Sequence, residues 1–167
     1  DEHALSELAE RLRSEGVAVE QASPEDLEAR HVISMIKFHD PAGLATEVFY
    51  GPHLEKVKPF VSPRGVKFET GQNGNMGFGH MVVAVPDLQQ CLSFYRDTLG
   101  LKITDYIDMK FGPNEFRIAF FHANPRHHSI AFGGPRKAAP DAAPLPGPRK
   151  RLNHFMLQVT ELDSVGL

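Results

Sequence analysis

Residues 79–88 read GHMVVAVPDL, and the related stretch NHFMLQVTEL occupies residues 153–162. In both stretches a small or polar residue precedes a histidine, and mostly apolar residues then lead to a valine. A segment typical of a helix N-terminus follows in each case. The recurrence indicates two copies of one structural module and places His80 and His154 at equivalent positions.

The sequence around the first stretch predicts a complete module. An apolar strand over residues 78–85 leads into a helix capped by Asp87, and the helix carries an apolar stripe that includes Cys91 as a core residue. Gly100 ends the helix. Three further strands are expected at 101–107, 116–122 and 129–132. The predicted order is therefore βαβββ.

A further, partial copy of the module lies near the N-terminus. The stretch LAERLRSEGVAVE, residues 8–20, parallels LSFYRDTLGLKIT, residues 92–104. In chain order, the N-terminal copy lacks its opening strand, the middle copy is complete, and the C-terminal copy stops at its helix. We expect an α+β protein built from tandem βαβββ modules, one complete and two partial, and we expect this chain to be a fragment of a longer protein.

Composition suggests where the modules begin and end. In the first partial module, a helix from Leu5 and a strand over 17–20 precede two strands, 31–38 and 44–50, that form a hairpin around Asp40 to Gly43. The expected segments are 1–51 for the end of an N-terminal domain, 52–75 for a Pro- and Gly-rich linker, 76–132 for the complete module, 133–148 for an exposed Pro/Gly/Ala-rich loop, and 149–167 for the start of the next module.

Charge and cysteine content exclude several classes of protein. The chain has 18 Lys and Arg against 21 Asp and Glu, a net charge of −3, which argues against nucleic-acid binding. No apolar run reaches the roughly 18 residues of a membrane helix, so no membrane partner is expected. Cys91 is the only cysteine, which excludes a disulfide framework and a cysteine-based zinc site and fits a reducing cytoplasm.

The two repeat-related histidines are the strongest candidates for chemistry. Equivalent strands of tandem modules, related by a pseudo-twofold axis, would bring His80 and His154 together. Imidazole binds Fe(II), Mn(II), Zn(II) and Cu(II), and two histidines with one carboxylate form the non-haem iron arrangement. The alternative is that each histidine is a structural residue hydrogen-bonded to a backbone partner.

Longer stretches resemble a known family. HMVVAVPDLQQCLSFYRDTLGL resembles the opening strand, helix and turn of the vicinal oxygen chelate superfamily. Within it, the stretches GFGHMVVAV, NPRHHSIAF, RLNHFMLQV and DPAGLATEVFYGP together resemble type I extradiol ring-cleaving dioxygenases of the 2,3-dihydroxybiphenyl 1,2-dioxygenase kind. The resemblance assigns the complete module and the copy after it to the catalytic domain of such an enzyme.

The resemblance implies roles for particular residues. His80 and His154 match the two iron-ligand histidines, and His128 matches the histidine beside the bound oxygen. The third ligand is a Glu expected beyond Leu167, together with a further His and a Tyr. Glu161 is not a substitute for that Glu, because it starts the next helix and is expected to be a solvated surface carboxylate.

The activity implied by the resemblance is Fe(II)-dependent cleavage of a catechol ring next to its two hydroxyls, with O₂ as co-substrate and Mn(II) as a possible replacement metal. An aryl or fused-ring catechol and a homo-oligomer are expected, in the degradation of aromatic compounds. His128 would perform the acid–base step. His127 would face away, because adjacent strand residues point to opposite faces, and Arg126 would share the side of His128.

Two other functions remain open on the same fold. A glyoxalase or epimerase would use its metal as a Lewis acid, but such relatives usually place a carboxylate on the closing strand, where this chain has Ser129-Ile130-Ala131-Phe132. A metal-free protein that sequesters a small molecule would have no reason to place His80 and His154 together.

Overall fold

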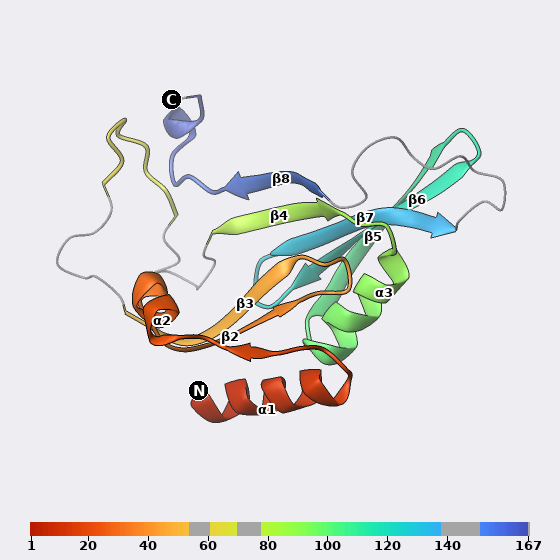
Figure 1. The fold of residues 1–167 in the computed structure, drawn as a ribbon. Coiled ribbons are helices and arrows are strands. Elements are labelled where there is room, and N and C mark those ends of the chain that lie inside the picture. Colours follow the sequence, from red (N-terminus) through yellow and green to blue (C-terminus); the bar gives the residue numbers. More distant parts are fainter. Residues whose placement is uncertain (54–60, 70–77, 138–150, 167) are drawn as a thin grey trace. The chain divides into compact units, whose positions relative to one another are not determined.

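The computed structural model describes residues 1–53, 61–69, 78–137 and 151–166 of the 167-residue chain. The chain forms two compact units, Asp1–Phe60 and Val61–Leu167. The first contains a three-stranded sheet and the second a five-stranded sheet (Figure 1). None of the helices in the described ranges is long and apolar enough to cross a membrane.

The first unit packs one long helix against its sheet. Its elements are α1 (Glu2–Ser14), β1 (Glu20–Gln21), α2 (Pro24–Arg30), β2 (Val32–His39) and β3 (Ala45–Pro52). The predicted hairpin is confirmed, since β2 and β3 pair antiparallel. In its turn the backbone N–H of Leu44 donates to Oδ1 of Asp40 at 2.7 Å, and Gly43 adopts φ 76°. The helix predicted from Leu5 is α1, and its Leu5, Ala9 and Leu12 are buried.

The sequence does not predict the helix α2. It indicates two successive strands in this region, 17–20 and 31–38. It begins with a capping box, in which Ser23 accepts from the backbone of Asp26 while the Asp26 side chain accepts from the backbone of Ser23. None of its residues is fully buried, so it has no apolar period to detect. The capping box and the proline at its first position are the signals that would have found it.

The second unit has the predicted βαβββ order followed by one strand of the next copy. Its elements are β4 (Gly79–Ala84), α3 (Leu88–Ser93), β5 (Lys102–Phe111), β6 (Asn114–His122), β7 (Ile130–Lys137) and β8 (Arg151–Leu157). The strand order is β5-β6-β7-β4-β8. The two repeat-related strands, β4 and β8, are therefore neighbours, as Figure 1 shows in green and blue.

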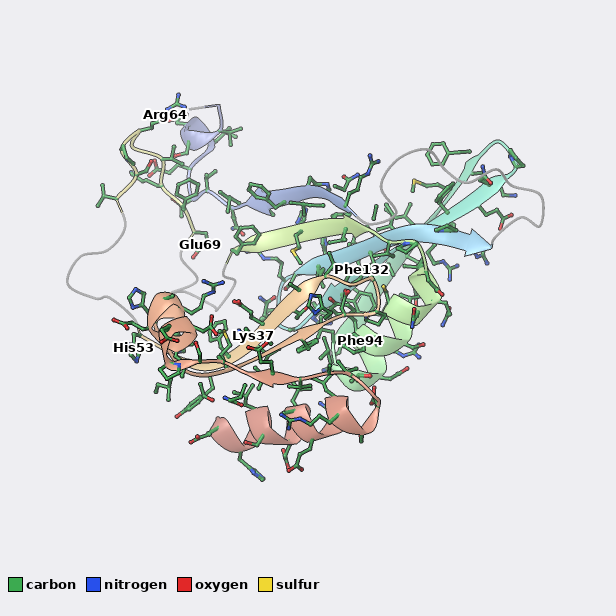
Figure 2. The ribbon with its side chains drawn as sticks, viewed as in Figure 1. Lys37, His53, Arg64, Glu69, Phe94 and Phe132 are labelled. Atoms are coloured by element: carbon green, nitrogen blue, oxygen red, sulfur yellow. The ribbon has the colours of Figure 1, made fainter. Side chains whose placement is uncertain are left out.

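A helical layer covers part of this sheet. It consists of α3 and a π-helical segment, η1 (Phe94–Thr98), where the sequence predicted one continuous α-helix to Leu99. The ring of Tyr95 packs on that of Phe132 in β7 with centroids 4.3 Å apart. Phe132 and Phe94, labelled in Figure 2, are both buried. Cys91, 1% exposed, lies in this layer as the sequence predicted.

Two segments predicted as irregular take part in the second unit. The strand β7 continues past its predicted end at Phe132 to Lys137 and pairs with β6, so the start of the expected loop is strand. Part of the expected linker also pairs with the chain beyond β8, through a bridge between Phe68 and Val159. The rest of the expected loop, 138–148, lies outside the described residues.

Candidate metal centre

The ladder between β4 and β8 positions the two repeat-related histidines. His80 pairs with Met156, and Val82 pairs with His154. The histidines are thus diagonal neighbours that project from the same face of the ladder. Their Nε2 atoms lie 3.1 Å apart, and the two rings are nearly perpendicular, at 77°. The predicted convergence of His80 and His154 is confirmed as geometry.

The separation of the two nitrogens suits a shared metal ion. Two nitrogens that bind one metal at about 2.1 Å and at a right angle lie about 3.0 Å apart. The Nε2 atoms of His80 and His154 lie at about this separation. Within the described ranges, no group of three or more His, Cys, Asp or Glu side chains could hold a metal ion. The pair supplies two ligand atoms of the kind that Fe(II), Mn(II) or Zn(II) accepts.

The side chain next to His154 selects its tautomer. Nδ1 of His154 lies 2.9 Å from Oδ1 of Asn153. Because an amide oxygen only accepts hydrogen bonds, Nδ1 carries the proton and Nε2 presents its lone pair. Metal-binding histidines are commonly oriented by such a partner on the second nitrogen. Asn153 was not singled out from the sequence, although its place before His154 in the repeat could have indicated this role.

His128 joins the pair from the segment between β6 and β7. Its ring stacks on that of His80, with centroids 4.2 Å apart and an angle of 36° between the planes. Phe120 in β6 also contacts it, with ring centroids 4.8 Å apart and an angle of 69° between the planes. His128 is half-buried, whereas His154 is exposed. The three imidazoles predicted from the sequence therefore form one cluster.

The orientation of His127 cannot rest on strand alternation. Residues 123–127 form bends rather than a strand, so the alternation of faces does not apply to them. Nδ1 of His127 lies 3.0 Å from Nδ1 of His128, and its ring also contacts Phe120. The carbonyl of His127 accepts from the Thr104 hydroxyl at 2.6 Å. His127 thus contacts His128, and its orientation away from the metal stays a prediction.

Arg126 is the buried cation of this segment. Its side chain is only 9% exposed, and one guanidinium nitrogen donates to Oε1 of Gln158 at 2.8 Å. The sequence interpretation placed Arg126 on the side of His128 but did not identify Gln158 as its partner. The two residues are far apart in sequence, and only the pairing of the strands brings them together.

The surroundings favour the neutral form of His80 and His128. Burial lowers the pKa of His80, and the neighbouring His154 and Arg126 lower it further. Burial also lowers the pKa of His128, with added contributions from His80, His127 and Arg126. Both rings are therefore uncharged at neutral pH, the state in which an imidazole nitrogen can bind a metal or accept a proton.

Glu161 lies outside this cluster, in agreement with its interpretation as a surface residue. Its carboxylate pairs with the ammonium of Lys67 at 2.7 Å, and the side chain is 50% exposed. Exposed pairs of this kind contribute little to stability.

Comparison with known families identifies the fold of this site. A profile of the Glyoxalase/Bleomycin resistance protein/Dioxygenase superfamily matches residues 77–167, more than half of the chain. The chain belongs to this superfamily. The membership confirms the α+β fold with βαβββ modules that the sequence predicted.

Several members of the superfamily are similar over almost the whole chain. The biphenyl-2,3-diol 1,2-dioxygenase of Paraburkholderia xenovorans is 40% identical, over 99% of this chain and 52% of its own length. The iron-dependent extradiol dioxygenase of Rhodococcus jostii is 37% identical, over 98% of this chain and 52% of its own length. A solved structure of a catechol 2,3-dioxygenase matches with a TM-score of 0.77 and 36% identity, over 97% of this chain and 50% of that one. The chain spans about half the length of these relatives.

Proposed function

We propose that this chain carries the metal-binding strands of a non-haem Fe(II) extradiol dioxygenase, which cleaves a catechol ring next to its two hydroxyls. The observation that supports this most directly is the pair of repeat-related Nε2 atoms 3.1 Å apart, with a third imidazole stacked beside them. The similarity to dioxygenases named for biphenyl-2,3-diol and catechol adds the substrate class. A metal-free sequestering protein would not need this cluster.

Iron is the proposed metal, and the donor set fits it. Two imidazole nitrogens suit Fe(II), and a relative with 37% identity is named as iron-dependent. Fe(II) bound there would supply Lewis acidity toward the catechol hydroxyls and a redox centre for reaction with O₂. As the family resemblance implies, we propose that a glutamate outside these 167 residues completes the ligand set.

The chain's own residues have distinct tasks in this proposal. His80 and His154 hold the metal through Nε2, and Asn153 keeps the His154 proton on Nδ1. His128 exchanges a proton with the reacting oxygen at Nε2, because its Nδ1 is engaged with Nδ1 of His127. The lowered pKa of His128 means that the ring starts neutral and can accept a proton before returning it.

The substrate proposed is a catechol with an aryl substituent or a fused ring, in the degradation of aromatic compounds. Phe120, which touches His128, places an aromatic surface beside the cluster. Aromatic rings stack favourably on such a surface. The relative with 40% identity is named for biphenyl-2,3-diol, which has an aryl group next to the catechol.

The test is ring cleavage by the protein in its natural full length, loaded with Fe(II) under argon. On addition of 2,3-dihydroxybiphenyl and air, we expect one O₂ consumed per substrate, both oxygen atoms in the product, and a coloured ring-opened product. Loading with Mn(II) instead shows which metal the site uses. Product formation without O₂ uptake would overturn the proposal and favour an isomerase.

Metal binding gives a test that does not depend on turnover. Isothermal titration with Co(II) under argon should show one site that His80→Ala and His154→Ala each abolish, because each removes one of two paired ligands. The 167-residue chain alone should bind Co(II) weakly, since two imidazoles leave most ligand positions to water. Tight one-to-one binding that survives His80→Ala would contradict the assignment.

A further inference from the structure

His128 is held differently from the other two imidazoles. His80 lies in β4 and His154 in β8, so a backbone ladder fixes the separation between them. His128 lies in the segment 123–129, after the end of β6 and before the start of β7. Its distance from the pair must therefore be set by contacts of that segment.

Several hydrogen bonds hold the segment to itself and to strands other than β8. Oδ1 of Asn124 accepts from the backbone N–H of Arg126 at 3.0 Å and from the hydroxyl of Ser129 at 3.3 Å. The backbone N–H of Ser129 donates to Phe121, and its carbonyl accepts from Met81 in β4. These bonds fold the segment and attach its far end to β6 and β4, and the carbonyl of His127 accepts from the Thr104 hydroxyl in β5 at 2.6 Å. None of them reaches β8.

The Arg126 side chain makes the connection to β8. Its guanidinium donates to Oε1 of Gln158 at 2.8 Å, and Gln158 directly follows β8. Gln158 is itself anchored, because its carbonyl accepts from the backbone N–H of Glu69 at 2.8 Å. Arg126 is 9% exposed, and a buried guanidinium needs hydrogen-bond acceptors. Loss of the bond to Gln158 would leave this buried charge with one acceptor fewer, which costs free energy.

We infer that Arg126 and Gln158 form a positioning pair that holds the segment carrying His128 in register with β8, and so keeps the His128 ring stacked against the His80–His154 pair. The role of this geometry in ring cleavage rests on the proposed function. Neither residue needs to touch substrate, because the pair acts through the placement of His128. A misplacement of about 1 Å at a reacting group can cost as much as 10²-fold in rate.

The geometry can be tested in the metal-free chain without substrate. NMR should show nuclear Overhauser contacts from the ring protons of His80 to those of both His128 and His154. In Arg126→Met and in Gln158→Leu, the His80–His128 contact should weaken severalfold while the His80–His154 contact persists. Gln158→Glu retains an acceptor oxygen and should restore the wild-type pattern. Arg96→Met, at an arginine paired with Asp97 on η1, is the matched control and should change neither contact.

The outcomes separate a positioning role from a general structural one. Retention of the His80–His128 contact in a folded Arg126→Met or Gln158→Leu protein would overturn the inference. Equal loss of both contacts would also overturn it, because the pair would then support the sheet as a whole. If Arg126→Met does not fold, Gln158→Leu and Gln158→Glu decide the question.

Activity provides a second, separate result. In the iron-loaded protein of natural length, Gln158→Leu should lower kcat about tenfold and leave KM for the catechol within about twofold, because His128 acts after the catechol has bound. If the NMR result is as expected but the wild-type protein cleaves no catechol, the positioning pair stands and the proposed function fails. If the wild type cleaves catechol and Gln158→Leu keeps the full kcat, the positioning pair fails.

Discussion

The strands β4 and β8 carry the same motif in different surroundings. β4 lies between β7 and β8, and its Val82 and Val83 are buried, at 8% and 3% exposure. β8 is at the edge of the described sheet, and six of its seven residues are exposed. The comparison shows that a repeat sets where a histidine lies along a strand, while the neighbours of that strand decide how firmly it is held.

The residue before each histidine reflects this difference. Gly79 precedes His80, and a Cβ there would lie 2.0 Å from the carbonyl oxygen of Met156, so the close approach of β8 requires glycine. Asn153 precedes His154 and orients its ring through Oδ1. On β4 the residue before the histidine allows the two backbones to pack closely. On β8 the residue before the histidine orients its imidazole ring.

The largest expected effect is on turnover, and it arises in the segment that carries His128 and not in β4 or β8. His128→Gln should retain Co(II) and catechol binding, because both ligand histidines remain, but should lower turnover by about 10²-fold or more, as losing an acid–base group does. Anaerobic binding and aerobic turnover assays on the full-length protein would measure this. The matched control, His127→Gln, should mainly lower stability. A reversal of the two results would assign proton transfer to His127.

The next effect compares the two positions that precede the histidines. Asn153→Ala should weaken Co(II) binding by about 10- to 100-fold and leave Tm unchanged, because it removes only the partner of a ligand. Gly79→Ala should lower both Co(II) affinity and Tm, since the added methyl forces the backbones of β4 and β8 apart. Titration calorimetry and thermal melts would separate the two. Equal losses of Tm in both variants would contradict the comparison.

The smallest effect is on the free energy of unfolding, and it compares two residues that pair across β4 and β8 but differ in burial. Val83 and Leu152 are directly paired, yet Val83 is 3% exposed and Leu152 is 54% exposed. Val83→Ala should cost about 2 kcal/mol in the free energy of unfolding, from lost burial and a residual cavity. Leu152→Ala should change it by less than about 0.5 kcal/mol. Urea denaturation monitored by circular dichroism would measure both, and similar costs would mean that β8 is covered in solution.

The elements that could be predicted from the sequence are those encoded by a repeat or a clear period. The βαβββ order, the hairpin around Asp40 and the convergence of His80 with His154 all follow from such patterns. The extension of β7 to Lys137 could not be predicted, because its Gly- and Pro-containing end is held by pairing with β6 rather than by local propensity.

The parts of the site that escaped prediction depend on irregular backbone or on distant contacts. The contact between His127 and His128 does not follow from strand alternation, because residues 123–127 form bends. The contact between Arg126 and Gln158 joins residues that no local pattern relates. Asn153 differs from these, because the repeat already marked its position and a closer reading of the motif would have suggested its role.

The single cysteine can report how often the second unit opens. Cys91 lies on the buried side of α3, is 1% exposed, and is the only thiol in the chain. A thiol reagent can react with it only when α3 lifts from the sheet or the unit unfolds. The rate of labelling therefore measures how often this core opens under native conditions, with no probe to be introduced.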